Sequence, residues 1–232
     1  MTFVVAEIGI NWDGDLKLAR EMISKSKQLG CDAVKFQAFD LEIVKNHLEK
    51  ERLLRSSISQ ENIQKIVNFA KDEKIEWFCT PMYEGAVDML EPFVKRYKIR
   101  EFDSRELLKN YNSKIFKKVL ETKKEIIISA NKSPKNNKLY NNKNIKWLYC
   151  VPKYPTKITD LDFSKINEFQ GYSNHSNEIL VPVVAASLGS EIIEVHITSD
   201  KNKDFIDNNV SFDYKELKEL MRQIRIVQRI KK

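Results

Sequence analysis

Residues 3–36 read FVVAEIGINWDGDLKLAREMISKSKQLGCDAVKF, and this stretch contains the unit that decides the fold. Residues 3–8 form a nearly continuous, β-branched apolar run, which is typical of a strand buried on both faces. Over residues 15–29 the apolar side chains recur at helical spacing, and Gly30 ends that pattern. Residues 33–36 form a second short apolar run. A strand, a helix and a second strand in this order predict parallel strands joined by a crossover helix.

The same alternation continues to the end of the chain. Further strands are expected at 76–79, 97–99, 125–129, 145–150, 170–173 and 192–197. A helix is expected directly after Ser59, which should be its N-cap. Further helices are expected at 85–93, 115–120, 180–187 and 213–230. Eight strands alternating with helices predict an α/β fold, a parallel eight-stranded (β/α)8 TIM barrel that forms one domain over residues 1–232.

One unit of this barrel is abnormal. Residues 131–145, NKSPKNNKLYNNKNI, hold five asparagines after Pro134 and almost no apolar side chains. No amphipathic helix can be written for this segment. The fifth helix is therefore predicted to be missing or replaced by a polar loop, which we expect to be exposed and mobile.

The composition excludes several classes of protein. The 232 residues carry a formal charge of +7, with 42% hydrophobic and 31% charged residues, which is typical of a soluble globular protein and excludes a disordered one. Neither a membrane span nor a basic signal-peptide leader is evident, so we expect a cytoplasmic protein without a membrane partner. The positive charges are spread out and predict no nucleic-acid partner. Three cysteines, an odd number beside apolar runs, predict buried thiols.

Active sites of such barrels lie at the carboxyl ends of the strands, and polar side chains mark every one of these ends. Two of the three histidines, His175 and His196, follow neighbouring strands, where they could share a metal ion or could be ordinary hydrogen-bonded residues. His47 lies in a charged segment and is expected at the surface. Lys35 and Lys98 lie within strands, which favours a clamp for an anionic ligand over an internal salt bridge.

Six motifs in order resemble those of the N-acetylneuraminate synthase family, which includes legionaminate and pseudaminate relatives. They are AEIGINWDGD (6–15), DAVKFQAF (32–39), CTP (79–81), YKI (97–99), GYSNHS (171–176) and IIEVHIT (192–198). The similarity extends from Val4 to Leu217. The opening motif followed by GYS-x-H and IE-x-H makes the signal specific.

The resemblance implies a TIM-barrel synthase that condenses phosphoenolpyruvate with an open-chain N-acylated hexosamine similar to N-acetylmannosamine, and releases phosphate. It implies a divalent metal, manganese, held by His175 and His196, which would polarise the sugar aldehyde. The catalytic candidates carried over are Glu7 as acid or base, Glu194 beside the reacting centre, and Lys98. The substrate-binding candidates carried over are Lys35, Thr80, Ser129 and Ser173 for phosphoenolpyruvate, and Asp103, Tyr154 and Asp207 for the sugar.

Several positions depart from the family pattern. The opening INHNG is here INWDG, so a histidine is replaced by Trp12. Glu101 stands where the family has a serine that contacts phosphoenolpyruvate, and its charge would repel that substrate unless Arg100 compensates. Pro152 replaces an asparagine. The segment between Phe39 and Ser59 is shorter than in the family.

The resemblance also implies partners. The family forms homodimers and carries an antifreeze-like domain that supplies a sugar-binding arginine, whereas this sequence stops after the last barrel helix. Sugar recognition is then expected from a separate chain, or the acceptor differs, or catalysis is impaired. Two alternatives remain open. One is a non-catalytic barrel that binds a sugar or anion or acts with a separate partner chain. The other is a different metal-assisted barrel enzyme, such as an aldol-type synthase or a sugar isomerase.

Overall fold

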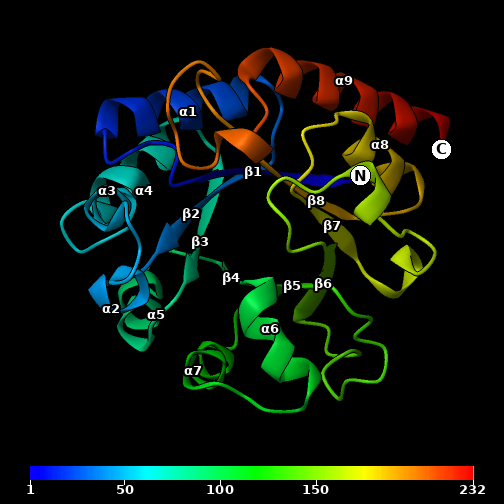
Figure 1. The fold of residues 1–232 in the computed structure, drawn as a ribbon, viewed down its shortest axis with the longest axis horizontal. Coiled ribbons are helices and arrows are strands. Elements are labelled where there is room, and N and C mark those ends of the chain that lie inside the picture. Colours follow the sequence, from blue (N-terminus) through cyan, green and yellow to red (C-terminus); the bar gives the residue numbers. More distant parts are fainter. Residues whose placement is uncertain (232) are drawn as a thin grey trace.

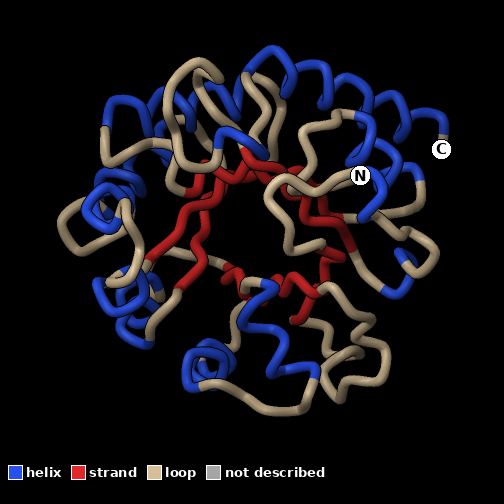
Figure 2. Tube along the Cα trace, in the orientation of Figure 1, coloured by secondary structure: helices blue, strands red, loops and turns tan. Residues whose placement is uncertain are grey.

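The computed structural model describes residues 1–231. Its eight strands are parallel and close into a barrel in sequence order, which confirms the predicted parallel barrel. Figure 2 shows the strands as a ring with helices and loops outside it. The strands are β1 (Phe3–Gly9), β2 (Ala33–Ala38), β3 (Glu76–Pro81), β4 (Arg96–Ile99), β5 (Glu125–Ala130), β6 (Ile145–Cys150), β7 (Gly171–Asn174) and β8 (Ile192–His196).

Helices cover the outside of this ring (Figure 1). They are α1 (Leu16–Gln28), α2 (Leu41–Val44), α3 (Lys50–Ser56), α4 (Ile63–Asp72), α5 (Glu84–Leu90), α6 (Glu101–Leu108), α7 (Lys114–Glu121), α8 (Leu180–Ser187) and α9 (Tyr214–Ile230), with short 3-10 helices at Ile158–Asp160, Ile166–Glu168 and Asn208–Val210. Among the described residues, no helix combines the length and apolar composition that crossing a bilayer requires.

Local sequence signals explain where the longest helices begin. Asp15 accepts hydrogen bonds from the backbone nitrogens of Lys17 and Leu18 and so caps α1. Asp213 and Glu216 form a reciprocal capping box at the start of α9. Both helices then bury one apolar face against the barrel, as the spacing of their apolar residues predicted.

The structure corrects the sequence prediction at four helices. The N-cap of α4 is Asn62 rather than Ser59, because a turn precedes the helix. Two short helices, α2 and α3, occupy the segment after β2 that was expected to be only polar chain. A further helix, α6, begins directly after β4, where no helix was predicted. The three helices that were not predicted, α2, α3 and α6, are short, so their apolar spacing repeats too few times to be recognised.

The connection between β5 and β6 consists of turns, and no helix is described there. The segment is nevertheless attached to the barrel, because Asn137 Nδ2 donates to the backbone oxygen of Leu107 at 2.7 Å, and Asn137 and Pro134 are buried. The predicted exposure therefore holds for only part of this segment.

The closed barrel sets the positions of the polar residues within it. Glu7 on β1 is in register with Lys35 on β2 and with His196 on β8. Ser173 on β7 is likewise in register with Glu194 on β8. Three strands that are consecutive around the ring, β8, β1 and β2, thus bring an imidazole, a carboxylate and an ammonium group to one level.

Candidate functional site

A cavity of about 400 Å³, which we term the central cavity, opens at the carboxyl ends of the strands. It is lined by all but one of the residues that the sequence predicted for the site. Those lining it are Glu7, Lys35, Thr80, Lys98, Ser129, Tyr154, Ser173, His175, Glu194, His196 and Asp207. The exception is Asp103, whose carboxylate receives two hydrogen bonds from Arg100, at 2.7 and 3.1 Å.

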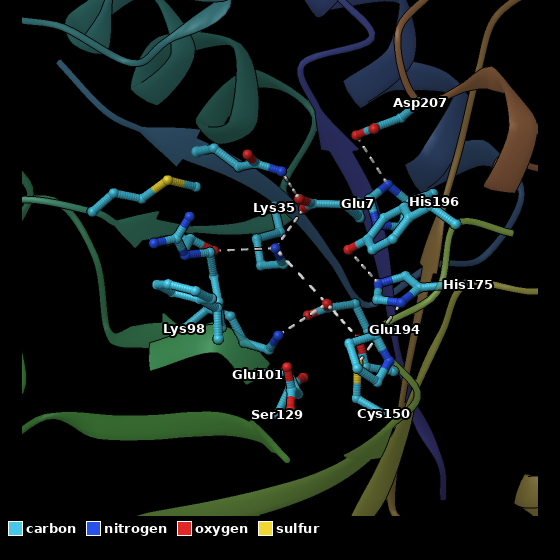
Figure 3. A pocket seen from close by; sticks show the side chains of 18 of the residues that line it. Glu7, Lys35, Lys98, Glu101, Ser129, Cys150, His175, Glu194, His196 and Asp207 are labelled. Carbon is cyan, nitrogen blue, oxygen red and sulfur yellow. Dashed lines mark hydrogen bonds and ion pairs between the residues drawn. The ribbon is translucent and has the colours of Figure 1, made fainter. Parts of the chain in front are cut away.

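Two buried lysines converge on buried carboxylates in this cavity (Figure 3). Lys35 Nζ lies 2.8 Å from Glu7 Oε2 and 3.8 Å from Glu194 Oε1, and it donates to Thr80 Oγ1 at 3.2 Å. Lys98 Nζ donates to Glu194 Oε1 at 3.2 Å. Burial opposes charge on Lys35, but Glu194 and Glu7 outweigh it and raise its pKa. The lysine is therefore charged at neutral pH and able to bind an anion.

Glu194 is the carboxylate that both ammonium groups share. Burial opposes its ionised form, but Lys35 and Lys98 outweigh that effect and hold its pKa at about 2. Ser173 Oγ also donates to Glu194 Oε1, at 3.0 Å. All three contacts reach the same oxygen, and Glu194 Oε2 is buried without a hydrogen-bond partner among the described residues. Ser129 Oγ is also buried and unpartnered, and unsatisfied polar atoms in a cavity indicate groups available to a ligand.

The two histidines form the other side of the cavity, with their ring centroids 5.4 Å apart. His175 Nδ1 lies 3.0 Å from the backbone oxygen of Val151, which fixes the proton on Nδ1 and leaves Nε2 as an acceptor. Tyr154 stacks on this ring, and its hydroxyl donates to Nε2 at 2.8 Å. Burial and the neighbouring His196 lower the pKa of His175 to about 3, so this imidazole is neutral, as a metal ligand must be.

His196 faces Asp207, whose Oδ2 lies 3.5 Å from His196 Nδ1. That distance is longer than a good hydrogen bond, and His196 Nδ1 has no other partner. Burial opposes protonation of His196, but Asp207 outweighs it and raises the pKa of the imidazole. Asn11 supports this arrangement, because its side chain accepts from the backbone nitrogen of Asp207 and donates to Ser211.

The donor set fits a metal ion that is only partly held by the protein. The described residues contain no preassembled group of three or more histidine, cysteine or carboxylate ligands. The acceptor Nε2 of His175 and one ring nitrogen of His196 could still supply two nitrogen ligands, with water or substrate oxygens completing the shell. His47, the third histidine, is exposed in the region of α2 and α3 and is not part of this site.

The beginning of α6 forms a wall of the central cavity that the sequence pattern predicted only in part. Compensation of Glu101 by Arg100 was left open, and in the structure the partner is Arg105, which makes three contacts with the carboxylate at 2.7–3.0 Å. Arg105 and Phe102 both line the cavity and were not predicted. The spacing of Glu101 and Arg105 is the i,i+4 pattern of a helical ion pair and could have indicated both the helix and the pairing.

Comparison with known proteins gives a consistent result. A family model described as the NeuB family matches residues 22–232. An uncharacterized protein of Methanocaldococcus jannaschii is 32% identical over 99% of this chain and 72% of its own length. The N,N'-diacetyllegionaminic acid synthase of Legionella pneumophila is 31% identical over 96% of this chain and 71% of its own length.

Solved structures agree with the sequence comparison. The crystal structure of an N-acetylneuraminic acid (sialic acid) synthetase from Leptospira borgpetersenii superposes with a TM-score of 0.85 at 27% identity. The superposition covers 99% of this chain and 84% of that one. The fold similarity therefore extends over nearly all of the described barrel.

Proposed function

The chain belongs to the NeuB family, and from this membership we propose that it condenses phosphoenolpyruvate with an open-chain N-acylated hexosamine to give a sialic-acid-type nonulosonic acid and phosphate. One observation carries the proposal: a single cavity of about 400 Å³ contains two buried ammonium groups on one side and two imidazoles on the other. Such a cavity suits one small anionic substrate beside a second substrate with a polarisable carbonyl.

Lys35 and Lys98 are the proposed ligands of phosphoenolpyruvate. Both are buried and both approach Glu194 Oε1, so an incoming phosphate or carboxylate would compete with Glu194 for the same two ammonium groups. The unpartnered Ser129 Oγ supplies a further donor within the cavity. Thr80 and Ser173, which contact Lys35 and Glu194, complete the proposed set.

Glu7 is the proposed acid or base. In the condensation, the enol carbon of phosphoenolpyruvate forms a bond to the aldehyde carbon of the sugar, and water adds to the carbon that carries the phosphate. Phosphate then leaves with cleavage of its bond to that carbon. Glu7 accepts a proton from the attacking water, and the alkoxide formed from the aldehyde oxygen takes up a proton, so the protons balance. The position of Glu7 is fixed by Lys35 at 2.8 Å and by Gln37 Nε2, which donates to Oε1 at 2.9 Å.

His175 and His196 are the proposed metal ligands, and a bound manganese ion would supply Lewis-acid polarisation of the sugar carbonyl. Tyr154 and Asp207 line the same side of the cavity and are proposed to contact the sugar. Asp103 is proposed to act there only indirectly, by holding Arg100, whose side chain lines the cavity.

The decisive experiment measures inorganic phosphate released from phosphoenolpyruvate by the purified chain. Each assay contains manganese and one of a panel of N-acylated hexosamines, including N-acetylmannosamine. Control assays leave out either the manganese or the sugar. We expect release that requires both the sugar and the metal. A Lys98→Met variant should lose this release, whereas Lys65→Gln, an exposed lysine on α4, should keep it.

Absence of release from folded, manganese-binding protein would overturn the proposal for the chain alone. The second candidate, a non-catalytic barrel that binds a sugar or anion, is favoured by one observation, the carboxylate of Glu101 in the wall of the cavity. Co-expression with an antifreeze-like protein then separates the two. Activity restored by that partner supports a synthase that needs a second chain, and continued absence of activity supports the non-catalytic barrel.

A further inference from the structure

A second cavity, of about 440 Å³, adjoins the central cavity, and we term it the side cavity. The two share Glu101, Arg105 and Pro152 in their walls. The ion pair between Glu101 and Arg105 therefore stands at the boundary between the two spaces. Pro152 is one of the positions at which the sequence departs from the family pattern, and Glu101 is another.

The local chain path explains why there is room for a cavity here. The side cavity lies between the end of α6, at Leu108 and Lys109, and the first residues after β5, Asn131 and Lys132. The β5–β6 connection forms turns in place of a helix, so within residues 1–231 no helix covers this flank of α6 (Figure 1). The link from Asn137 to Leu107 holds the later part of the connection against α6 and leaves its first residues beside the cavity.

The charges around the side cavity favour an anion. Three cationic side chains line it, Arg105, Lys109 and Lys132, against one lining carboxylate, Glu101. Glu106 reduces this excess because it pairs with Lys109 at 3.0 Å. Lys132 is exposed and has no acidic partner among the described residues. A positive charge thus remains at the cavity after the two ion pairs are counted.

Arg105 has hydrogen-bonding capacity to spare. It uses Nε and Nη2 on Glu101, and a guanidinium group carries five N–H donors in all. Its side chain is 50% exposed, so the unused edge is accessible. An arginine held on one edge by a carboxylate is fixed in orientation and can bind an oxyanion with the other edge.

From this arrangement we propose that the side cavity binds a phosphate-class oxyanion through Arg105, Lys109 and Lys132, next to the proposed reaction site. Asn131 supplies an uncharged amide donor to the same space. The chemistry of the ligand follows from the residues alone, but its source rests on the proposed function. That source is either the phosphate released from phosphoenolpyruvate or a phosphate group carried by the acceptor sugar.

The test titrates orthophosphate into the full chain by calorimetry, with and without phosphoenolpyruvate, in the absence of sugar. The variant is Lys109→Gln with Lys132→Gln, both on exposed side chains, and the matched control is Lys65→Gln. We expect the double variant to bind orthophosphate about tenfold more weakly, because two charged donors are lost. Its affinity for phosphoenolpyruvate should change less than about twofold, since neither lysine lines the central cavity.

Three results would overturn the proposal: no orthophosphate binding by the wild-type chain, equal binding by wild type and double variant, or parallel loss of orthophosphate and phosphoenolpyruvate affinity. These binding measurements need no turnover, so they remain decisive if the proposed function fails.

Steady-state assays of an active chain then identify the source of the phosphate group. Orthophosphate inhibition that phosphoenolpyruvate does not relieve, and that the double variant loses, identifies the released product. A selective loss of kcat/KM for a 6-phosphorylated hexosamine identifies the acceptor.

Discussion

Lys98 Nζ lies 3.2 Å from Glu194 Oε1, although the two residues are 96 positions apart in the sequence and stand on β4 and β8, across the barrel from each other. Lys35 approaches the same oxygen from β2 at 3.8 Å. Two buried ammonium groups thus share Glu194 Oε1, and Lys35 also pairs with Glu7 Oε2 at 2.8 Å. An anionic substrate that takes over these ammonium groups would exchange one compensating charge for another, which avoids the cost of leaving them buried and unpaired.

The first prediction concerns this shared carboxylate. Glu194→Gln keeps the size of the side chain but leaves Lys35 and Lys98 with less compensating charge. We expect the free energy of unfolding to fall by about 3 kcal/mol, because removing one partner of a buried ion pair leaves an uncompensated charge. Urea denaturation at pH 7 measures the change, and Glu61→Gln, an exposed carboxylate, is the control. A loss equal to that of the control would show that solvent already screens these charges.

The second prediction is the pH dependence of the same effect. The pKa of Glu194 is about 2 in the folded chain and about 4.3 in an unfolded one. Because the pKa of Glu194 is lower in the folded chain, the stabilisation from its ionised carboxylate is complete at any pH above the pKa of the unfolded chain. It is lost as the pH falls through the pKa of the folded chain. The stability difference between wild type and Glu194→Gln should therefore stay constant from pH 5 to 7. It should shrink by about 1.4 kcal/mol per pH unit between pH 4 and 2. A difference independent of pH in that range would contradict this assignment.

The barrel and most residues of its central cavity could be predicted from the sequence, and the reason is local. Each strand is a short apolar run, and the polar residue at its end must face the open end of a closed barrel. The contacts of α6 could not be predicted in the same way. Its apolar pattern is short, so Glu101 and Asp103 were expected at a strand tip. Within a helix they instead pair with Arg105 and Arg100, and Asp103 does not line the cavity.

The third prediction concerns the two buried histidines. His175→Ala and His196→Ala should each weaken manganese binding by about 100-fold, since even loss of a residue that only orients a ligand costs roughly 10–100-fold. His47→Ala is the matched control, because this histidine is exposed and distant from the cavity. Titration of manganese followed by electron paramagnetic resonance gives the affinities. Unchanged affinity in both cavity variants would exclude the proposed metal site.

The fourth prediction separates metal binding from sugar binding at Tyr154. Its hydroxyl donates to His175 Nε2 at 2.8 Å, so it competes with a metal ion for that lone pair. Tyr154→Phe should bind manganese about fivefold more tightly, as expected from removing one hydrogen bond worth about 1 kcal/mol. The same variant should lose turnover if the hydroxyl contacts the sugar. Tyr111→Phe, on an exposed tyrosine, is the control. Weaker manganese binding by Tyr154→Phe would instead identify the hydroxyl as a group that holds the metal.

The last prediction concerns the carboxylate in the wall between the two cavities. Glu101 lies in the wall of the central cavity and repels any anion bound there, but Arg105 offsets most of its charge. Glu101→Gln should therefore lower the KM for phosphoenolpyruvate about fivefold, the effect of removing about 1 kcal/mol of screened repulsion. Arg105→Gln should raise the same KM, because it leaves Glu101 uncompensated. Glu121→Gln, an exposed carboxylate on α7, should leave it unchanged. If Glu101→Gln raised the KM, the carboxylate would be acting mainly to hold Arg105 in place, and the arginine would be the group that phosphoenolpyruvate needs.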